Sequence, residues 1–149
     1  MYAYYRPERT LTDREKAMKS AAKGIISSVN EGKETVLTSV VHLSEVVNIL
    51  KHRMRPSELV ELVGGILTNE SVRVEGVTAE DYLGAAESAM ENKVDPNDSL
   101  AVLLMKRRHI GEIYTFDSGF DNVEGVRRLP GAADGEGADA AEADPERRD

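Results

Sequence analysis

Three acidic side chains lie where the sequence predicts one edge of a β-sheet. Glu45 falls in a predicted helix that follows a β-type run, Asp117 directly follows a second such run, and Asp98 lies in the first turn of another predicted helix. Ligands of parallel α/β sheets bind beyond the carboxyl ends of the strands, where these acids are expected. Carboxylate oxygens are the ligands that Mg²⁺ and Mn²⁺ prefer. The sequence therefore suggests an all-oxygen site for one of these ions.

Each acid also has a purely structural explanation. The helix macrodipole favours an acid such as Asp98 in a first turn, and Asp117 is followed by Ser118 and Gly119, which suits a turn. Glu45 could be an ordinary exposed helix residue, although Val46 and Val47 after it indicate an apolar helix. Each acid alone is better explained by structure, and it is their shared edge that favours the metal site.

Helix and strand signals alternate along the chain. Thr12 and Glu15 are spaced as in a capping box, in which each side chain satisfies a free backbone amide at a helix start. Thr78 and the pair Asp95-Pro96 are placed to start two further helices. Helices are predicted over 12–30, 41–51, 57–67, 78–90 and 95–111, and strands over 35–39, 72–77, 113–116 and 125–129. This order predicts an α/β fold with a mostly parallel sheet and helices on both faces.

Composition divides the chain into two parts. Residues 1–129 have the apolar content of a folded domain, whereas residues 130–149 are rich in Ala, Gly, Asp and Glu and are predicted to be a disordered acidic tail. This tail carries much of the formal net charge of −8. A solubilising tail is the favoured explanation, and an interaction arm is the alternative. The acidic balance argues against a protein that coats nucleic acid through bulk electrostatics.

Several classes of protein are excluded by the residues that the sequence lacks. It contains no cysteine, so disulfides, thiolate zinc sites and cysteine nucleophiles are absent. No apolar run approaches the roughly 20 residues that span a bilayer, and the start does not have the pattern of a signal peptide. No membrane partner is therefore expected, and a cytoplasmic location is predicted.

Three stretches resemble motifs of the PIN-domain nucleases and occur in the family's order. Residues 37–47 (LTSVVHLSEVV) resemble the second motif, a strand followed by a helix with a metal-binding Glu. Residues 97–101 (NDSLA) are similar to the third motif, an Asp at a helix start. Residues 114–121 (YTFDSGFD) are similar to the fourth, a strand ending in Thr-x-Asp with another acid after it. Within the family, the small single-domain size is similar to that of the VapC toxins of toxin–antitoxin pairs.

The resemblance implies a PIN-like three-layer α/β/α fold over 1–129 and a metal-dependent endoribonuclease. Glu45, Asp98 and Asp117 would be its catalytic acids and would hold Mg²⁺ or Mn²⁺, with Asp121 as a further ligand. A metal-activated water would attack a phosphodiester of the RNA substrate. Thr115, and Ser99 next to Asp98, could orient the carboxylates or a water through hydrogen bonds. The partners implied are RNA and a cognate antitoxin protein, and a homodimer is an option for which the sequence indicates no apolar face.

The sequence departs from the family at its start. PIN proteins open with a buried central strand that ends in Asp, whereas residues 1–7 (MYAYYRP) resemble the stretch that normally comes just after that Asp. We expect that Met1 is an internal methionine and that the natural protein starts earlier. Without the first strand, the sheet would have an unpaired gap between its two halves, where backbone groups need partners.

Other functions stay open. The absent first acid suggests, as the alternative, a catalytically inactive PIN-type protein- or RNA-binding module. A signalling domain with a phosphorylatable Asp ranks last, because it usually needs an acidic pair and a Lys that are not visible here. Two basic clusters could steer RNA, although a solvated surface explains them better, and His42 could line the pocket one turn before Glu45. The clusters are Lys51, Arg53 and Arg55, and Lys106, Arg107 and Arg108.

Overall fold

The computed structural model describes residues 11–130 as an arrangement of helices and short strands. The predicted tail and the first ten residues of the chain lie outside this range, except Pro130. The elements in chain order are α2 (Asp13–Asn30), β1 (Val36–Ser39), α3 (Val40–Leu50), α4 (Pro56–Thr68), β2 (Val72–Glu75), α5 (Ala79–Asn92), α6 (Pro96–Arg108), β3 (Glu112–Tyr114), the 3-10 helix η2 (Ser118–Asn122) and β4 (Arg127–Leu129). Within residues 11–130, no helix has the length and apolar character needed to cross a membrane.

The helix starts follow from local side-chain chemistry. The Thr12 backbone N–H donates to the Glu15 carboxylate at 2.8 Å, and the Glu15 N–H donates to the Thr12 hydroxyl at 3.2 Å, which confirms the predicted capping box. Thr78 begins α5 with the same reciprocal bonds. The start of α4 differs by one position, because Pro56 occupies its first turn and Arg55 is the cap. The missing N–H of proline costs nothing at that position.

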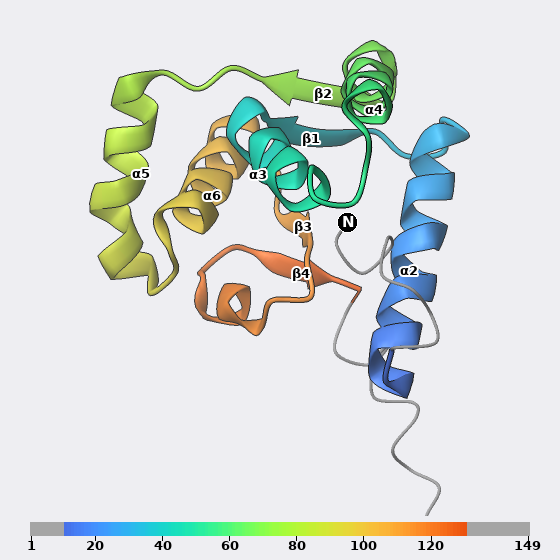
Figure 1. The fold of residues 1–149 in the computed structure, drawn as a ribbon. Helices are drawn as coiled ribbons and strands as arrows, with labels where there is room; N and C mark the ends of the chain where they lie inside the picture. The colour runs from blue at the N-terminus through green and yellow to red at the C-terminus, as the bar shows by residue number, and fades with distance from the viewer. Residues whose placement is uncertain (1–10, 131–149) are drawn as a thin grey trace, which may run out of the picture.

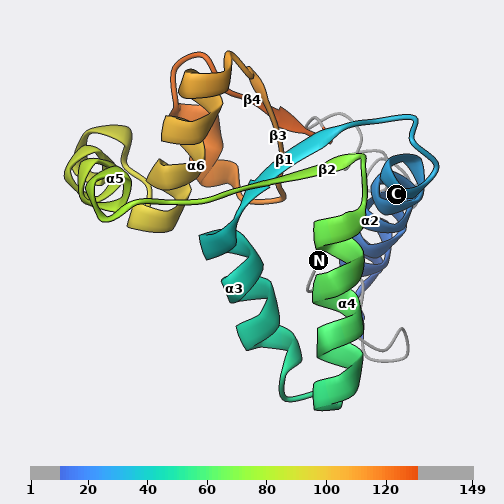
Figure 2. The same cartoon turned by 90° about the horizontal axis from the view of Figure 1, so that it is seen from above.

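The strands form two separate parallel pairs. β1 pairs with β2 in the register Val36↔Val72, and β3 pairs with β4 in the register Glu112↔Arg127. Parallel pairing is as predicted, and Figure 2 shows both pairs between the helices. Within residues 11–130, however, nothing joins the two pairs into one continuous sheet.

Each strand pair has an open edge. The Val36 N–H donates to the Ser71 carbonyl at 2.9 Å, on the β2 side. Peptide groups of successive residues alternate between the two edges of a strand, so those of Leu37 face away from β2. The Thr115 N–H donates to the Leu129 carbonyl at 2.9 Å, so by the same alternation the peptide groups of Tyr114 face away from β4. Within residues 11–130, no strand pairs with either of these edges.

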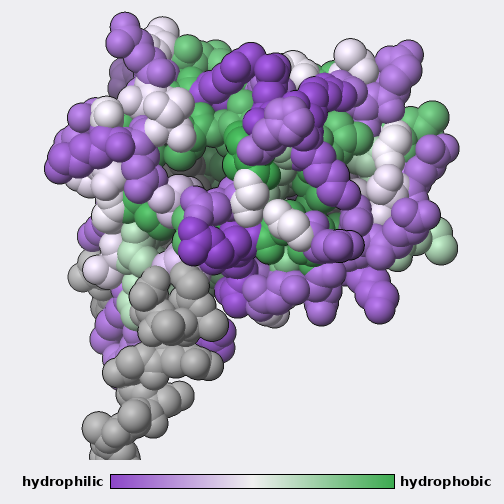
Figure 3. All heavy atoms as spheres, turned by 180° about the vertical axis from the view of Figure 1, so that it is seen from behind, coloured by the Kyte–Doolittle hydropathy of each residue, from purple (hydrophilic) through white to green (hydrophobic). Residues whose placement is uncertain are grey.

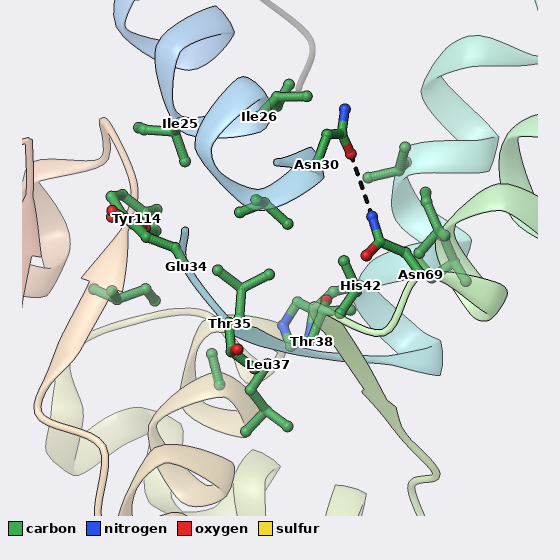
Figure 4. A pocket seen from close by; sticks show the side chains of 18 of the residues that line it. Ile25, Ile26, Asn30, Glu34, Thr35, Leu37, Thr38, His42, Asn69 and Tyr114 are labelled. Atoms are coloured by element: carbon green, nitrogen blue, oxygen red, sulfur yellow. Dashed lines mark hydrogen bonds between the residues drawn. The ribbon is translucent and has the colours of Figure 1, made fainter. Parts of the chain in front are cut away.

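A large, mostly apolar cavity of about 1060 Å³ lies between the two strand pairs. Side chains of α2, α4 and α6 line it together with residues of β1 and β3, and Figure 4 shows Ile25, Leu37 and Tyr114 around it. On the face seen in Figure 3, apolar side chains gather around a hollow. Two contacts cross its rim: Asn69 Nδ2 donates to Asn30 Oδ1 at 3.2 Å (Figure 4), and the Tyr114 hydroxyl donates to Glu34.

Helix α6 is the most buried helix and belongs to both hydrophobic clusters of the described chain. Leu100 and Leu104 pack with Ala85 of α5, which lies beside α6 in Figure 1. Val102 packs on the other side with Phe120 of η2 and with Val123. Because its two faces are packed against different elements, α6 has a fixed position, and so does its first turn.

Candidate metal centre

Local capping motifs hold two of the predicted acids, Asp98 and Asp117, whereas Glu45 lies in the middle of a helix. Glu45 lies in α3, which begins directly after β1 with Ser39 as its cap. Asp98 lies in the first turn of α6, where its backbone N–H donates to Asp95 Oδ1 at 2.9 Å. Asp117 caps η2: its Oδ1 accepts from the Gly119 N–H at 2.8 Å. Asp98 thus lies in a first helical turn, Asp117 directly before one, and Glu45 in the helix that follows β1.

The electrostatics of Asp98 connect the three acids. Burial and, after it, the negative charges of Asp95, Asp117 and Glu45 together raise the pKa of Asp98 to about 6, while His42 opposes them. Like charges that crowd together disfavour ionisation, and a bound cation relieves that cost. Two of the other predicted acids, Glu45 and Asp117, thus act electrostatically on Asp98 in the first turn of α6.

Glu45 belongs to a network of side-chain hydrogen bonds that the sequence analysis did not predict. Asn97 Nδ2 donates to Glu45 Oε1 at 2.6 Å, and the Tyr82 hydroxyl donates to Asn97 Oδ1 at 2.7 Å. His42 contacts the Asn97 backbone oxygen through Nε2 at 3.0 Å and the Ser39 hydroxyl through Nδ1 at 2.7 Å. A carbonyl can only accept, so Nε2 carries a proton and donates to it. His42 thus links elements near the site.

Asp121 is engaged by a cation of the chain itself. Arg128 donates to both of its carboxylate oxygens, through Nε and Nη2, at 2.9 Å each. This contact lowers the pKa of Asp121, and the charge of Asp117 adds to the factors that raise the pKa of Arg128. A metal ion that used Asp121 would have to compete with the guanidinium for its oxygens.

Two hydroxyl groups expected to orient carboxylates have other partners. The Thr115 hydroxyl accepts from the Asp117 backbone N–H at 3.1 Å, so it orients the backbone that carries this acid. Ser99 is buried, and its hydroxyl accepts from Asn92 Nδ2 at 3.3 Å. Thr115 therefore supports one residue of the acidic edge, which comprises Glu45, Asp98 and Asp117. Ser99 instead holds the end of α5 against α6.

The donor chemistry of the acids fits Mg²⁺, although the geometry is open. Within residues 11–130, no three His, Cys, Asp or Glu side chains lie close enough together to hold a metal ion. Mg²⁺ usually keeps several waters and takes only one or two carboxylates, with substrate phosphates completing its ligands. The all-oxygen donors and the crowded charge at Asp98 suit such an ion. Glu45, Tyr82 and Asn97 also line a shallow pocket of about 490 Å³.

The two basic clusters have neighbours of their own. Arg107 pairs with Asp81 and lowers the pKa of that acid to about 2, and Arg108 pairs with Glu75. These arginines lie at the opposite end of α6 from Asp98, about 15 Å along the axis at 1.5 Å per residue. In the other cluster, Arg55 pairs with Glu58 at 3.1 Å, and Lys51 donates to Asn48 at 3.1 Å. Arg55, Arg107 and Arg108 are thus held in ion pairs with acids of the chain itself.

The fold and the acidic edge define a class, the small α/β proteins with carboxylates at the ends of parallel strands. The family model of the PIN domain matches residues 10–126, which include all four predicted acids. The chain therefore belongs to the PIN domain family. PIN domains are generally nucleases, so a nuclease-type hydrolase that acts on nucleic acid is indicated. No curated protein and no solved structure matched the chain.

Proposed function

We propose that the protein is a metal-dependent endoribonuclease and the toxin of a VapBC-like toxin–antitoxin pair. The observation that carries the proposal is that burial and the charges of Asp95, Asp117 and Glu45 together raise the pKa of Asp98 to about 6. Membership of the PIN family supports a nuclease, and an RNA substrate and Mg²⁺ or Mn²⁺ are the specific parts that we add.

In this proposal Glu45, Asp98 and Asp117 hold the ion, and Asp121 joins them when Arg128 releases it. A divalent cation bound there lowers the pKa of water and neutralises charge on a phosphate. The chain's own residues hold the acids in place: Asn97 binds one oxygen of Glu45, and the Gly119 N–H binds one oxygen of Asp117. The ion also accounts for RNA binding by a chain with a net charge of −8.

RNA cleavage by the purified protein, with Mg²⁺ or Mn²⁺ added and removed, tests this function. The parent protein is expected to cleave only with the ion present, and Asp98→Asn and Asp117→Asn are expected to lose cleavage while staying folded. Glu87→Gln in α5 is the matched control, because this exposed acid lies outside the site. Cleavage by both site variants at the parent rate would contradict the assignment of the acids.

The toxin role is tested in cells. Expression of the protein in the cytoplasm should arrest growth, and the Asp98→Asn variant should not. Co-expression of a cognate antitoxin that blocks the acidic edge should restore growth. The antitoxin should then co-purify with the toxin, which would be a monomer or a homodimer in the complex. Unimpaired growth at confirmed expression would count against a toxin while leaving the nuclease chemistry to the cleavage assay.

A second candidate function is a catalytically inactive PIN-type module that binds protein or RNA. It is favoured by one observation: within residues 11–130, no three possible metal-binding side chains lie close enough together to hold one ion. This function predicts RNA or protein binding that is the same with and without divalent ions, and no cleavage under any metal condition. The same purified protein and the same metal series separate it from the nuclease.

A further inference from the structure

We propose that Asn97 is the positioning residue of the acidic edge and that Tyr82 fixes the orientation of its amide. The amide holds the Glu45 carboxylate in a set place relative to Asp98, the next residue along α6. This inference rests on the proposed function for its consequence, which is metal binding, but the positioning itself is a statement about contacts that can be measured separately.

Asn97 is the point where the three helices α3, α5 and α6 meet. Its side chain contacts Glu45, 52 residues earlier in α3, and Tyr82, 15 residues earlier in α5. Its backbone oxygen, in the first turn of α6, accepts from His42 at the start of α3. A single residue thus connects two elements to the turn that carries Asp98.

The chemistry of the partners fixes which way the amide points. A carboxylate such as Glu45 can only accept, so the Asn97 NH₂ group must face it. The amide oxygen then faces Tyr82, whose hydroxyl donates to it. Turning the amide over would place its oxygen against the carboxylate, which is repulsive. The Tyr82 hydroxyl therefore stabilises the one orientation that supports Glu45.

The backbone of Asn97 gives this side chain a firm base. Two and three residues further on, Ser99 and Leu100 are almost completely buried, at 1% and 0% exposure. The Ser99 N–H donates to the Asp95 carbonyl at 2.8 Å, so the first turn of α6 is closed. The amide occupies Oε1 of Glu45, and no bond within residues 11–130 is seen at the other carboxylate oxygen, Oε2. Oε2 is therefore the atom that we assign to the ion.

Positioning is expected to affect the site more than the fold. Glu45, Asn97 and Tyr82 meet at a partly solvated surface, where the loss of one hydrogen bond changes the stability of the fold little. Groups that orient metal ligands, in contrast, typically change metal affinity or activity by about 10- to 100-fold when removed. A large loss of Mn²⁺ affinity with a small change in melting temperature is therefore the signature of the role.

The test measures Mn²⁺ affinity by titration calorimetry, the side-chain amide signal of Asn97 by NMR, and RNA cleavage. Asn97→Ala should weaken Mn²⁺ binding and cleavage by about 10- to 100-fold, and Tyr82→Phe should do so to a smaller extent. Asn97→Asp should be the most damaging, because it places a second carboxylate against Glu45. Matched controls are Asn69→Ala and Tyr114→Phe, which remove hydrogen bonds at the rim of the cavity and should leave Mn²⁺ affinity unchanged.

The outcomes separate this inference from the proposed function. If Glu45→Gln loses Mn²⁺ affinity while Asn97→Ala and Tyr82→Phe keep it, the positioning role is overturned and the nuclease proposal stands. If the parent binds no Mn²⁺, the nuclease proposal fails, and NMR alone decides the positioning role. The Asn97 amide signal should then shift in both Glu45→Gln and Tyr82→Phe. An Asn97 signal that is the same in both variants as in the parent overturns the inference.

Discussion

The imidazole Nε2 of His42 lies 3.0 Å from the backbone oxygen of Asn97, and this contact joins the helix of Glu45 to the helix of Asp98. The other ring nitrogen lies 2.7 Å from the hydroxyl of Ser39, which is 0% exposed. One side chain thus connects the end of β1, the start of α3 and the start of α6. The two helices that carry acids are therefore held at a fixed separation by a residue that is itself not an acid.

Replacing His42 with alanine should destabilise the protein. The Asn97 carbonyl and the Ser39 hydroxyl would both lose a partner, and a buried polar group left without one costs about 1–3 kcal/mol. Urea unfolding should show this loss, and Mn²⁺ affinity should fall with it. His52→Ala is the matched control, since His52 is exposed and lies after α3. Equal stability of the two variants would contradict the linking role of His42.

Asp98 should titrate near pH 6 in the folded protein. Burial and the charges of Asp95, Asp117 and Glu45 raise its pKa from 3.8 to about 6. Because the folded pKa lies above the unfolded one, this group stabilises the fold below about pH 4, and its contribution is lost as pH rises through 6. Carbon-detected NMR of the Asp side chains over pH 3–8 measures the pKa directly, and urea unfolding over the same range measures the stability.

Two variants verify the cause of this shift. Asp117→Asn removes one of the charges that act on Asp98 and should lower its pKa, whereas Glu124→Gln, at an exposed acid outside that set, should not. Saturating Mg²⁺ should also lower it, because a cation favours the ionised carboxylate. An Asp98 signal that titrates near its ordinary value in the metal-free parent would show that the acids do not converge there.

The local parts of this structure were predictable from sequence, and the long-range parts were not. The capping residues Thr12 and Thr78 act through atoms three residues away, so their spacing alone indicated two helix starts. Glu45, Asp98 and Asp117 were predicted as site residues because the carboxyl ends of parallel strands meet at one edge. The contact of Asn97 with Tyr82 depends on how α5 and α6 pack, which no local pattern records. The choice of partners, β1 with β2 and β3 with β4, likewise depends on strand order, not on the alternation that predicts each strand.

Gly119→Ala should displace Asp117 without unfolding the protein. A Cβ at position 119 would lie 3.1 Å from Asp117 Oδ1, which is closer than a comfortable contact, so the carboxylate must move. The same oxygen accepts from the Gly119 N–H, so the movement should also weaken that bond. We expect about a 10-fold loss of Mn²⁺ affinity, the lower end of what disturbing a ligand's support usually produces.

Gly24→Ala in α2 is the control for this substitution. A Cβ at position 24 meets nothing within 4 Å, so the change should stabilise the helix by about 0.5–1 kcal/mol and leave Mn²⁺ affinity as it is. Thermal unfolding and Mn²⁺ titration of both variants give the comparison. Unaltered Mn²⁺ affinity in Gly119→Ala would mean that the Asp117 carboxylate does not bind the ion.

Removing Arg128 should reveal whether Asp121 binds the ion. In the folded protein both oxygens of Asp121 accept from this guanidinium, which lowers the pKa of the acid. Arg128→Gln should therefore raise the pKa of Asp121 towards its ordinary value and free its oxygens. If Asp121 is a ligand, Mn²⁺ affinity should rise, and adding Asp121→Asn should cancel the gain.

The same pair has a signature in acid that does not need a metal. A folded pKa below the unfolded one stabilises the protein above about pH 4, and that stability is lost as pH falls through the folded value. Arg128→Gln should therefore flatten the acid side of the stability curve measured by urea unfolding between pH 2 and pH 7. If the acid side of the stability curve flattens while Mn²⁺ affinity stays at the parent value, Asp121 holds β4 against η2 through Arg128 and is not a metal ligand. A rise in Mn²⁺ affinity that Asp121→Asn cancels would instead place Asp121 beside Asp117 in the metal site.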